Sequence, residues 1–409
     1  MNPAFGPAHI RALTDIFNAK SVKLRDTLMD EIRNIASSNG IDVTVWLSRM
    51  TLDAIGLAGF NYSFDALNVN ERPNELSEAF NHMVQTAQDI NLLTVLQGFI
   101  PPLRVISTAQ TRVIKKSQQT MTRIGRHLLR DAKAAIRAES DTKTIEKSNV
   151  KGKDLLSLLV RANTATDIPD SQRMDDEDVL AQVPTFLAAG HETTSTATTW
   201  ALYALTQNKA AQTKLRDELL TMDTENPSMD ALNALPYLDM VVRETLRLHA
   251  PVANSIRVAT KDDVIPLETP VVDRYGVQRH EIRIQKGDSI WVPILAVNRS
   301  KEIWGEDAHE FRPERWESTP EAAHQIPGVW GNMLTFIGGP RACIGYRFSL
   351  VEMKSLLFAL VRAFEFDLAV PASEVSKRNV VVTRPLITSD PEEGRQFRLP
   401  LIIRPFVRD

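Results

Sequence analysis

Apolar residues recur every three to four positions through most of the first two-thirds of the 409-residue chain. This spacing predicts helices over Ile10 to Ser37 and over Thr108 to Ala138, where many charged residues lie between the apolar ones. The stretch from Ala138 to Lys153 has almost no large apolar residue and is expected to be an exposed loop. No repeat of fixed period occurs. The first two-thirds should therefore be mostly helical.

A longer helix is expected from about Asp175 to Thr206, because Asp175 and Asp176 suit a helix N-terminus. At about 1.5 Å per residue this helix would span on the order of 45 Å. Pro184 lacks a backbone hydrogen-bond donor and should kink it. The polar, β-branched run that begins at His191 has poor helix propensity. A long helix weakened in its middle indicates a local reason for the irregularity.

The pattern changes after a further helix, which is expected from about Pro236 to His249. Pro236 can start this helix and Pro251 can end it. Short β-rich segments follow, such as residues 281–295 and the alternating residues 364–370. We therefore predict one compact unit over residues 1–409 that is mainly α with small β-sheets.

Composition and charge narrow the classes of protein that fit this pattern. The chain is 43% hydrophobic and 24% charged, which is ordinary for a soluble globular protein. A net charge of -3 gives no case for nucleic acid as the main partner. No apolar run reaches about 18 residues, so no transmembrane helix is predicted in this chain. The first residues lack the basic start and the continuous apolar core of a signal peptide.

Cys343 is the only cysteine, which excludes an internal disulfide framework and any multi-cysteine zinc or iron–sulfur site. It lies in the sequence FIGGPRACIGYR, whose three glycines permit tight turns and the close approach of a flat or bulky group. Apolar residues at helical spacing follow it, so Cys343 should precede a helix N-terminus. With Arg341 two residues earlier, the sulfur is expected to be held as a thiolate.

Three uses of this cysteine remain open on chemical grounds alone. A lone cysteine can be a small buried hydrophobe. It can be the nucleophile of a hydrolase, which needs a base such as one of the eight histidines, although no protease-like signature surrounds it. It can also be the single axial thiolate of a haem iron, because the porphyrin supplies the other in-plane ligands.

The spacing Phe336-x-x-Gly339-x-Arg341-x-Cys343-x-Gly345 resembles the haem-binding signature of the cytochrome P450 family, with every fixed position filled. The resemblance implies that Cys343 is the axial ligand of heme b (iron protoporphyrin IX). It also implies that Phe336 packs near the thiolate and that Arg341 is a candidate partner of a haem propionate. Arg257, shortly after Pro251-Val252, is a second propionate candidate by the same resemblance.

Glu244 and Arg247 resemble the ExxR motif of the family, and residues i and i+3 share a helix face, so the two can pair. Taken alone, this spacing fits a solvated surface ion pair equally well. Downstream, the segment from Phe311 to Trp316 resembles the family's PERF-type segment, here with tryptophan last. The resemblance implies that Arg315 joins Glu244 and Arg247 in a buried triad. That triad would hold the fold around the haem and would have no catalytic role.

The segment from Ala189 to Thr194, inside the long helix, resembles the oxygen-activation motif of the family. By this resemblance Ala189 and Gly190 make room for dioxygen at the iron. Thr193 can donate a hydrogen bond to the oxygen ligand, or it can bond a backbone carbonyl of its own helix. Glu192 can relay protons from solvent. His191 is expected to have a structural partner on the outer face of the helix.

The resemblance also implies a substrate and a redox partner. The substrate pocket would use apolar residues, which predicts a hydrophobic small molecule: Phe186, Ala189, Val252, Ala253, Ile256 and Val382. Electrons would come from NADPH through a flavoprotein reductase, because the chain has no dinucleotide-binding GxGxxG between a strand and a helix. Arg347 and Lys354 are candidates for a basic docking face, and ordinary surface charge is the alternative for both.

The resemblance covers Asn2 to Pro405 and is similar in detail to fungal microsomal members. It implies a monooxygenase, located for a longer form at the cytosolic face of the endoplasmic reticulum membrane. Relatives carry an N-terminal segment with an anchor, the first strands and the first helices, which is expected to be absent from this chain. Two other functions stay open, namely a haem-thiolate isomerase or dehydratase and a truncated, non-catalytic chain. An intact Glu192-Thr193 pair argues against the isomerase.

Overall fold

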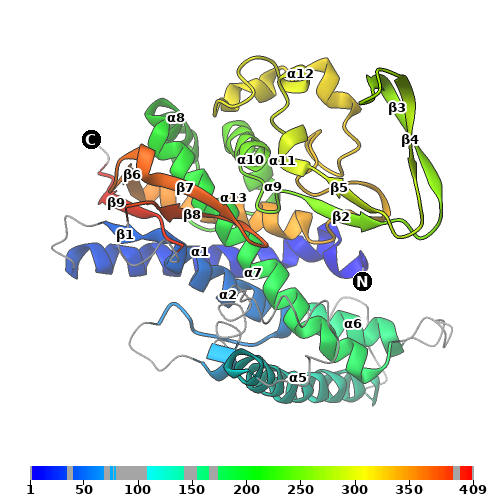
Figure 1. Cartoon of the computed structure of the whole chain (residues 1–409). Coiled ribbons are helices and arrows are strands. Elements are labelled where there is room, and N and C mark those ends of the chain that lie inside the picture. Colours follow the sequence, from blue (N-terminus) through cyan, green and yellow to red (C-terminus); the bar gives the residue numbers. More distant parts are fainter. Residues whose placement is uncertain are drawn as a thin grey trace.

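Helices dominate the structure, a computed structural model that describes residues 2–34, 40–68, 74–76, 78–79, 108–141, 154–164, 174–389 and 397–407 (Figure 1). The α-helices are α1 (Pro7–Asn34), α2 (Val43–Phe60), α5 (Ala109–Asp141), α6 (Leu155–Thr164), α7 (Asp176–Gln207), α8 (Lys209–Leu220), α9 (Met229–Asn233), α10 (Pro236–Leu248), α11 (Ile294–Val297), α12 (Lys301–Trp304) and α13 (Tyr346–Ala363). Short 3-10 helices are η1 (Asn2–Phe5), η4 (Pro313–Glu317), η5 (Glu321–Gln325), η6 (Gly339–Arg341) and η7 (Ala372–Glu374).

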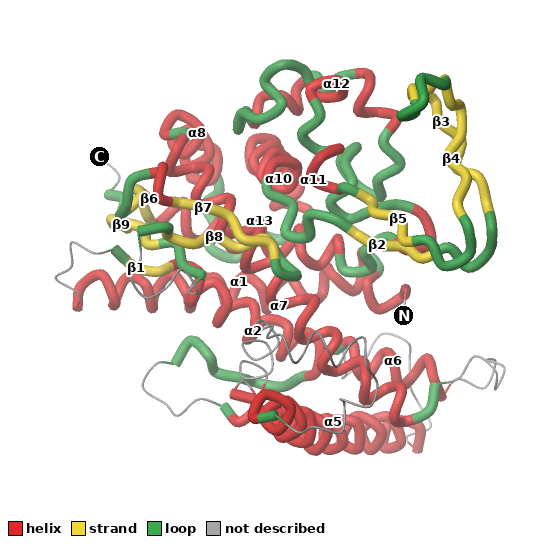
Figure 2. The backbone as a smooth tube through the Cα atoms, in the orientation of Figure 1, coloured by secondary structure: helices red, strands yellow, loops and turns green. Residues whose placement is uncertain are grey.

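The strands are short, and all pair antiparallel in the described residues. They are β1 (Ile41–Asp42), β2 (Ser255–Val258), β3 (Asp263–Val272), β4 (Gln278–Ile284), β5 (Ser289–Val292), β6 (Phe364–Leu368), β7 (Val375–Asn379), β8 (Thr383–Ile387) and β9 (Pro400–Pro405). They form one sheet in the order β1-β9-β6 and the pairs β2-β5, β3-β4 and β7-β8. Figure 2 shows the β1-β9-β6 sheet and the β7-β8 pair on the left of the molecule and the β2-β5 and β3-β4 pairs on the right. The predicted class, mainly α with small sheets, is confirmed.

The long helix α7 runs obliquely through the middle of the molecule (Figure 1) and contacts α2, α5, α10 and α13. Its N-cap is Asp175, whose side chain accepts a hydrogen bond from the backbone N–H of Asp178 at 2.7 Å. The helix continues through Pro184 to Gln207. The predicted helix is therefore confirmed to within one residue at each end.

Two helix boundaries differ from the prediction. α1 begins at Pro7, because proline has no N–H to lose at the first turn of a helix. α5 continues to Asp141, so the predicted exposed loop was wrong over its first residues. Ala138 and Glu139 favour helix by intrinsic propensity, which outweighs the lack of apolar residues there. Residues 142–153 of that loop lie outside the described residues.

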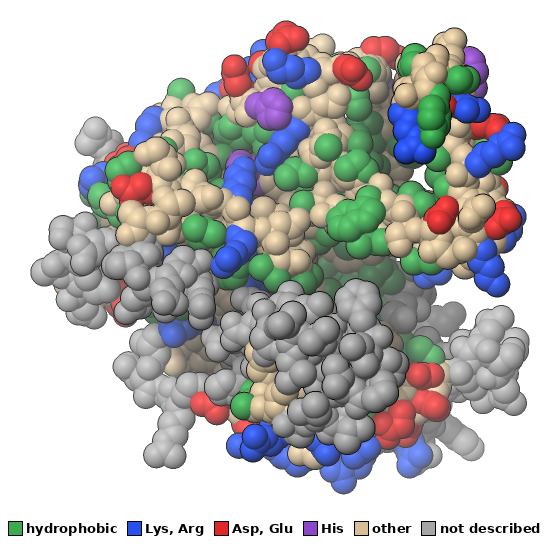
Figure 3. All heavy atoms as spheres, in the orientation of Figure 1, with side chains coloured by type: hydrophobic (Ala, Val, Ile, Leu, Met, Phe, Trp, Pro, Cys, Tyr) green, Lys and Arg blue, Asp and Glu red, His purple; other side chains and the backbone are tan. Residues whose placement is uncertain are grey.

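A single cluster of buried apolar side chains extends from Ala4 to Ile403 and includes residues of all the long helices. α13 is its most buried part, since its residues from Leu350 to Val361 all lie inside the protein. α5 is different, because its outer face carries Lys and Arg side chains that Figure 3 shows along the lower edge of the molecule. None of the described helices is long and apolar enough to cross a membrane.

Candidate active site

The segment around Cys343 is a tightly closed loop. The backbone N–H of Cys343 donates to the carbonyl of Phe336 at 2.8 Å, which closes the loop at its two ends. A Cβ on Gly338 would lie 1.6 Å from the carbonyl oxygen of Pro327, so only glycine fits there. Gly339 has a φ of +69°, in the left-handed region that glycine favours. Gly338 and Gly339 are thus required by the backbone conformation of the loop that carries Cys343.

Cys343 precedes α13, whose N-cap is Gly345, as the sequence predicts. Burial raises the pKa of the Cys343 thiol, and the backbone N–H of Gly345, which donates to the sulfur, opposes this only in part. The thiolate expected beside Arg341 and the helix end therefore stays a prediction for a metal-bound Cys343. The thiol loses its proton most readily to a metal ion, because the ligand form of cysteine is the thiolate.

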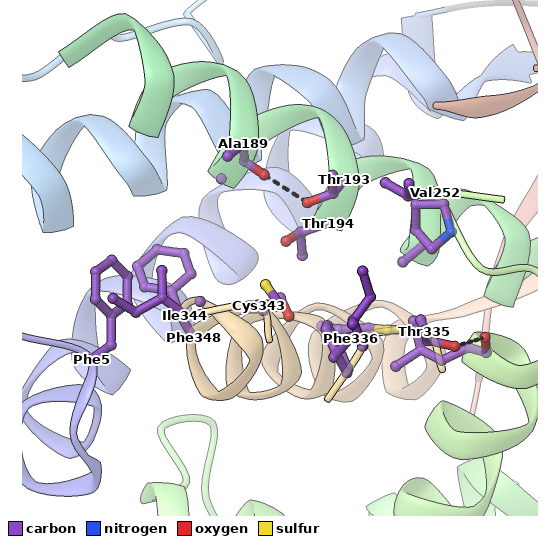
Figure 4. A pocket seen from close by; sticks show the side chains of 18 of the residues that line it. Phe5, Ala189, Thr193, Thr194, Val252, Thr335, Phe336, Cys343, Ile344 and Phe348 are labelled. Carbon is purple, nitrogen blue, oxygen red and sulfur yellow. Dashed lines mark hydrogen bonds between the residues drawn. The ribbon is translucent and has the colours of Figure 1, made fainter. Parts of the chain in front are cut away.

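The sulfur faces a cavity of about 260 Å³ between the Cys343 loop and α7. Figure 4 shows the sulfur pointing across this cavity toward the face of α7 that carries Ala189, Thr193 and Thr194. The walls are mostly apolar and include Phe5, Ile55, Leu155, Ala197, Leu246, Ile294, Ile344 and Phe348. The site is therefore a mostly apolar pocket with the Cys343 thiol on one side and the hydroxyl groups of Thr193 and Thr194 on the other.

Several residues that the sequence singled out line this cavity together with Cys343. They are Phe186, Ala189, Gly190, Thr193, Val252, Phe336, Arg341 and Gly345. Phe336 also packs against Tyr346, with the ring centroids 6.0 Å apart. Other candidates are not among the lining residues: Glu192, Arg257, Ala253, Ile256, Gly339 and Val382. The structure thus brings together the cysteine loop and one face of α7, and it separates them from the remaining candidates.

Thr193 and Gly190 have local partners that explain their residue types. The Thr193 hydroxyl donates to the carbonyl of Ala189 at 2.7 Å, which is one of the two alternatives that the sequence allows. A Cβ on Gly190 would meet the side chain of Ile55 on α2 at 2.9 Å. The small size of Gly190 therefore lets α2 and α7 pack closely. Gly190 also lines the cavity, and its expected role in making room for dioxygen stays a prediction.

Glu192 points to the opposite side of α7, where it lines a second cavity of about 180 Å³. This second cavity is polar, with hydroxyl groups from α2 and α7: Thr44, Ser48, Ser195, Thr196 and Thr199. The Glu192 carboxylate forms an ion pair with Arg384 of β8. Glu192 and Thr193, although adjacent in α7, thus line two different cavities.

His191 is buried against α2, where its Nε2 lies 2.6 Å from the hydroxyl oxygen of Ser48. Its backbone carbonyl accepts a hydrogen bond from Thr51 at 3.1 Å. Burial lowers the pKa of His191, and the nearby Glu192 opposes this shift. It does not line the Cys343 cavity. His191 thus has a structural partner, Ser48, on the face of α7 away from Cys343, as expected.

The other separated candidates have their own surroundings. Arg257 lies on β2, and its guanidinium donates to the Ser255 hydroxyl at 2.6 Å and to the carbonyl of Ile256 at 2.9 Å. Ile256 is 48% exposed on the same strand. Val382 is buried in the turn between β7 and β8. The backbone N–H of the next residue, Thr383, donates to the carbonyl of Pro251 at 2.8 Å, which ties this turn to the loop after α10.

Glu244, Arg247 and Arg315 lie in one buried network. The guanidinium of Arg247 donates to the two oxygens of Glu244 at 2.7 and 2.9 Å. Arg315 donates to Glu244 at 3.3 Å and pairs with Asp307 at 2.7 Å. Arg247 also donates to the carbonyls of Asn298 and Ala308 at 2.9 and 2.6 Å. This arrangement is a buried network and not a solvated surface pair.

The two candidates for a docking face separate in the structure. Arg347 is exposed, and its guanidinium lies 4.4 Å from the ring centroid of Tyr346. Lys354 is only 3% exposed, and it bonds Asp239 at 2.8 Å and Asn233 at 2.9 Å. A role for Lys354 on an accessible basic face is therefore wrong, because its charge is already neutralised inside the protein.

Sequence reasoning missed part of the site. Phe5 and Ile55 line the cavity from η1 and α2, and no motif marks either residue. Glu352 on α13 is completely buried next to Thr194, a cavity-lining residue. Its carboxylate at a buried position of an otherwise apolar helix face is a signal that the sequence itself carries.

Comparison with known proteins identifies the group to which this sequence is related. The sequence model of the family Cytochrome P450 matches residues 1–388. Cytochrome P450 monooxygenase 205 of Postia placenta is 57% identical over 99% of this chain and 74% of its own length. Cytochrome P450 monooxygenase 128 of the same fungus is 53% identical over 100% of this chain and 75% of its own length.

A more distant relative is the ganoderic acid synthetase CYP5150L8 of Ganoderma lucidum, which is 35% identical over 90% of this chain and 70% of its own length. The motifs that place Cys343, Glu244 and Arg315 in this sequence fit these relationships, and so does the mainly helical architecture. The chain belongs to the cytochrome P450 family.

Proposed function

We propose that residues 1–409 form one haem domain that inserts an oxygen atom from O2 into a hydrophobic small molecule, with Cys343 as the axial ligand of heme b. The observation that carries this proposal is the position of the only sulfur nucleophile, in the wall of an apolar cavity and opposite Thr193. The family supports the general monooxygenase reaction.

The residues of the cavity fit such a group. Among the described residues no three acidic, histidine or cysteine side chains come close enough to hold a metal ion together. A metal held by Cys343 would thus take its other ligands from a bound prosthetic group such as haem. Arg341 lines the cavity and offers a cation to a propionate. The apolar lining suits the faces of a porphyrin and a hydrophobic substrate.

The bound haem would supply the oxygen chemistry, while the chain supplies position and protons. The Thr193 hydroxyl keeps both lone pairs available at the cavity while it donates to Ala189. Glu192 holds its carboxylate in the polar cavity, where water can supply protons. We propose that Glu192 passes a proton around the edge of α7 to Thr193, because the two residues are adjacent in the helix.

The apolar walls support a hydrophobic substrate, with Phe186, Val252 and Ile55 as candidate contacts. Electrons would come from NADPH through a flavoprotein reductase, and the exposed Arg347 is a candidate contact for it. For a longer form of the protein we propose the cytosolic face of the endoplasmic reticulum membrane, by resemblance to microsomal relatives.

The first test is the difference spectrum of the reduced, carbon monoxide-bound protein, beside the variant Cys343→Ser. A red-shifted Soret band that disappears in Cys343→Ser is the expected result, because only thiolate ligation gives that band. Haem absorbance without the shifted band, and indifferent to the substitution, would overturn the role of Cys343. With haem bound, product formation that needs both NADPH and reductase separates a monooxygenase from an isomerase, which needs neither.

A further inference from the structure

The outer face of α5 carries a line of basic side chains. The helix holds eight Lys and Arg residues, most of them three or four positions apart: Arg112, Lys115, Lys116, Arg123, Arg126, Arg130, Lys133 and Arg137. Since successive residues of a helix lie about 100° apart around its axis, all eight fall within an arc of about 100°, and from Arg112 to Arg137 the line runs roughly 38 Å. Figure 3 shows Lys and Arg side chains along the lower edge of the molecule, where Figure 1 places α5.

The opposite face of α5 is fixed inside the protein. Four residues are buried there, namely Ser117, Met121, Leu129 and Ala132. The helix contacts α6 and α7. The basic residues point the other way, and all except the half-buried Lys133 are exposed. A partner outside the protein can therefore reach the charges of α5 but not its apolar side chains.

Most of these charges are not neutralised within the chain. Three of the basic residues form ion pairs with acids of neighbouring segments: Arg123 with Glu75, Arg126 with Glu177 and Lys133 with Asp176. The other five form no ion pair with a carboxylate of the described residues: Arg112, Lys115, Lys116, Arg130 and Arg137. The whole chain has a net charge of -3, so the positive charge of this face is a local concentration. A surface of this kind attracts an anionic partner.

The narrowness of this basic line favours a flat anionic surface over a nucleic acid. A helix that enters a duplex groove has phosphates on both of its sides. Acids border the α5 line on both flanks, with Asp131 on one side and with Asp176 and Glu177 of α7 on the other. These acids would meet the phosphates of a duplex, whereas a plane touches only the outermost arc of the helix. α5 also has no aromatic side chain on which an unpaired base could stack.

The same face fits a protein partner poorly. A protein interface usually has an apolar core inside a polar rim. Val113 is the one exposed large apolar residue in the described part of α5, and it lies about 100° around the helix from Arg112. The basic line therefore has no apolar core. Polybasic faces of amphipathic helices are instead typical of binding to anionic lipid.

We propose that the outer face of α5 binds the surface of an anionic phospholipid bilayer, through the five basic residues that form no ion pair. The phosphates and carboxylates of the lipid headgroups would supply the acids that these residues lack. Because the apolar face of α5 stays inside the protein, this helix does not insert, and the contact is electrostatic and weakened by salt. The inference goes beyond the proposed oxygenation and does not depend on bound haem, so either can fail without the other.

The experiment sediments the folded full chain with vesicles of phosphatidylcholine alone and with vesicles that contain about one-third phosphatidylserine. One variant carries five substitutions on α5: Arg112→Gln, Lys115→Gln, Lys116→Gln, Arg130→Gln and Arg137→Gln. Glutamine has a helix propensity close to that of Lys and Arg, so α5 should persist. The matched control removes the same charge from exposed residues in and beside β3 and β4: Lys261→Gln, Arg274→Gln, Arg279→Gln, Arg283→Gln and Lys286→Gln.

The expected result is binding to the phosphatidylserine vesicles only, which weakens as NaCl rises from about 50 to about 300 mM. Each basic residue near an anionic leaflet strengthens binding about fivefold, so the loss of only two contacts weakens it on the order of thirtyfold. The α5 variant should bind at least this much more weakly. The control variant should stay within about threefold of the unmodified chain, because charges beyond the screening length contribute little.

A second measurement needs no variant and decides the matter even if the α5 variant fails to fold. The lysines of the unmodified chain are labelled with a water-soluble acetylating ester, with and without phosphatidylserine vesicles, and each site is quantified by mass spectrometry. Lys115 and Lys116 should react several-fold more slowly on the vesicles, while Lys261 and Lys286 should not change. The proposal would be overturned by no binding, by equal binding of both variants, or by full reactivity of Lys115 and Lys116 on the vesicles. Duplex DNA bound as tightly as the vesicles, at equal phosphate concentration and salt, would overturn it in favour of a nucleic acid.

Discussion

Glu244 on α10 and Glu352 on α13 are both completely buried, yet their surroundings are opposite. Glu244 accepts hydrogen bonds from Arg247 and Arg315 and from the indole N–H of Trp316 at 3.1 Å. Neither oxygen of Glu352 has a hydrogen-bond partner among the described residues. The same side chain is thus built into a charged network in one region and left with almost no donors in the other.

This difference sets the charge of the two carboxyl groups. A buried carboxylate is tolerated where cations and N–H donors replace its lost water, as they do around Glu244. Burial raises the pKa of Glu352 well above the ordinary value, while the hydroxyl of Thr194 opposes the rise. Burial therefore favours the neutral acid form of Glu352, which lies on α13 next to the cavity-lining Thr194. Glu244, by contrast, holds Arg247 and Arg315 together in one buried network.

The largest expected effect follows from breaking the charged network. Glu244→Gln would leave the buried guanidinium of Arg247 without a carboxylate and Arg315 with Asp307 alone, at a cost of about 3–5 kcal/mol. Since a domain is typically stable by about 5–15 kcal/mol, this is a large share of the total. Urea unfolding followed by circular dichroism would measure it. The exposed pair Arg11–Asp230 is the matched control, and Arg11→Ala should leave the unfolding midpoint unchanged.

A milder change tests whether each donor to Glu244 contributes separately. Trp316→Phe keeps an aromatic ring beside Trp304, whose centroid lies 5.4 Å away, but removes the indole N–H that reaches Glu244. A hydrogen bond to a charged group is worth about 1.5–3 kcal/mol, so the loss should be smaller than in Glu244→Gln. The same urea titration compares the two variants. Equal losses would mean that the network fails as a whole and not donor by donor.

Much of the fold could be predicted from the sequence because the helices obey strong local rules. The bounds of α7 were predicted to within one residue, since Asp175 is a good N-cap and apolar residues recur at helical spacing over many turns. The end of α5 could not be found from hydrophobic spacing, because Ala138 and Glu139 are helical through propensity alone. The buried position of Lys354 depends on Asp239, which comes from a different helix.

The candidate site was only partly predictable for a related reason. Cys343 stands out because it is the one cysteine in a loop whose glycines have a steric purpose. The side of α7 on which Glu192 lies follows from the helical period, yet its partner Arg384 is 192 positions away along the chain. Phe5 and Ile55 reach the cavity only through tertiary packing. Sequence patterns can identify reactive groups, but they cannot show which walls enclose them.

The neutral state of Glu352 predicts a pH dependence of stability. Its pKa is raised in the folded state, so the folded chain binds more protons than the unfolded chain above the ordinary glutamate pKa. The contribution of Glu352 to the free energy of unfolding is therefore fully present at acid pH. It is lost as the pH rises toward the pKa of Glu352 in the folded state. Glu352→Gln, which is neutral at every pH, should not show this loss. The test is the difference in unfolding free energy between wild type and Glu352→Gln from pH 5 to 9.

Subtracting the unfolding free energy of Glu352→Gln from that of the wild type isolates the effect of Glu352. Both proteins contain buried His191 and His249, whose pKa values are lowered and therefore have the opposite effect on stability as pH rises. Their lowered pKa values make stability rise with pH near neutrality, and this rise cancels in the subtraction. A difference that does not change with pH would show that Glu352 is ionised in the folded protein. It would then need a donor like those of Glu244.

The smallest expected effect comes from Thr194→Val, which removes the hydroxyl that opposes the raised pKa of Glu352 and keeps a β-branched side chain of similar size. The Thr194 hydroxyl lowers the pKa of Glu352, so its removal should raise that pKa further. Stability should then continue to fall over a wider pH range than in the wild type, while at pH 5 the two proteins should be nearly equal. Thr198→Val, one turn along the same helix, is the matched control, because that hydroxyl bonds the carbonyl of Thr194 at 2.9 Å. If both variants gave the same pH profile, the Thr194 hydroxyl would have no influence on Glu352. The neutral acid of α13 would then owe its state to burial alone.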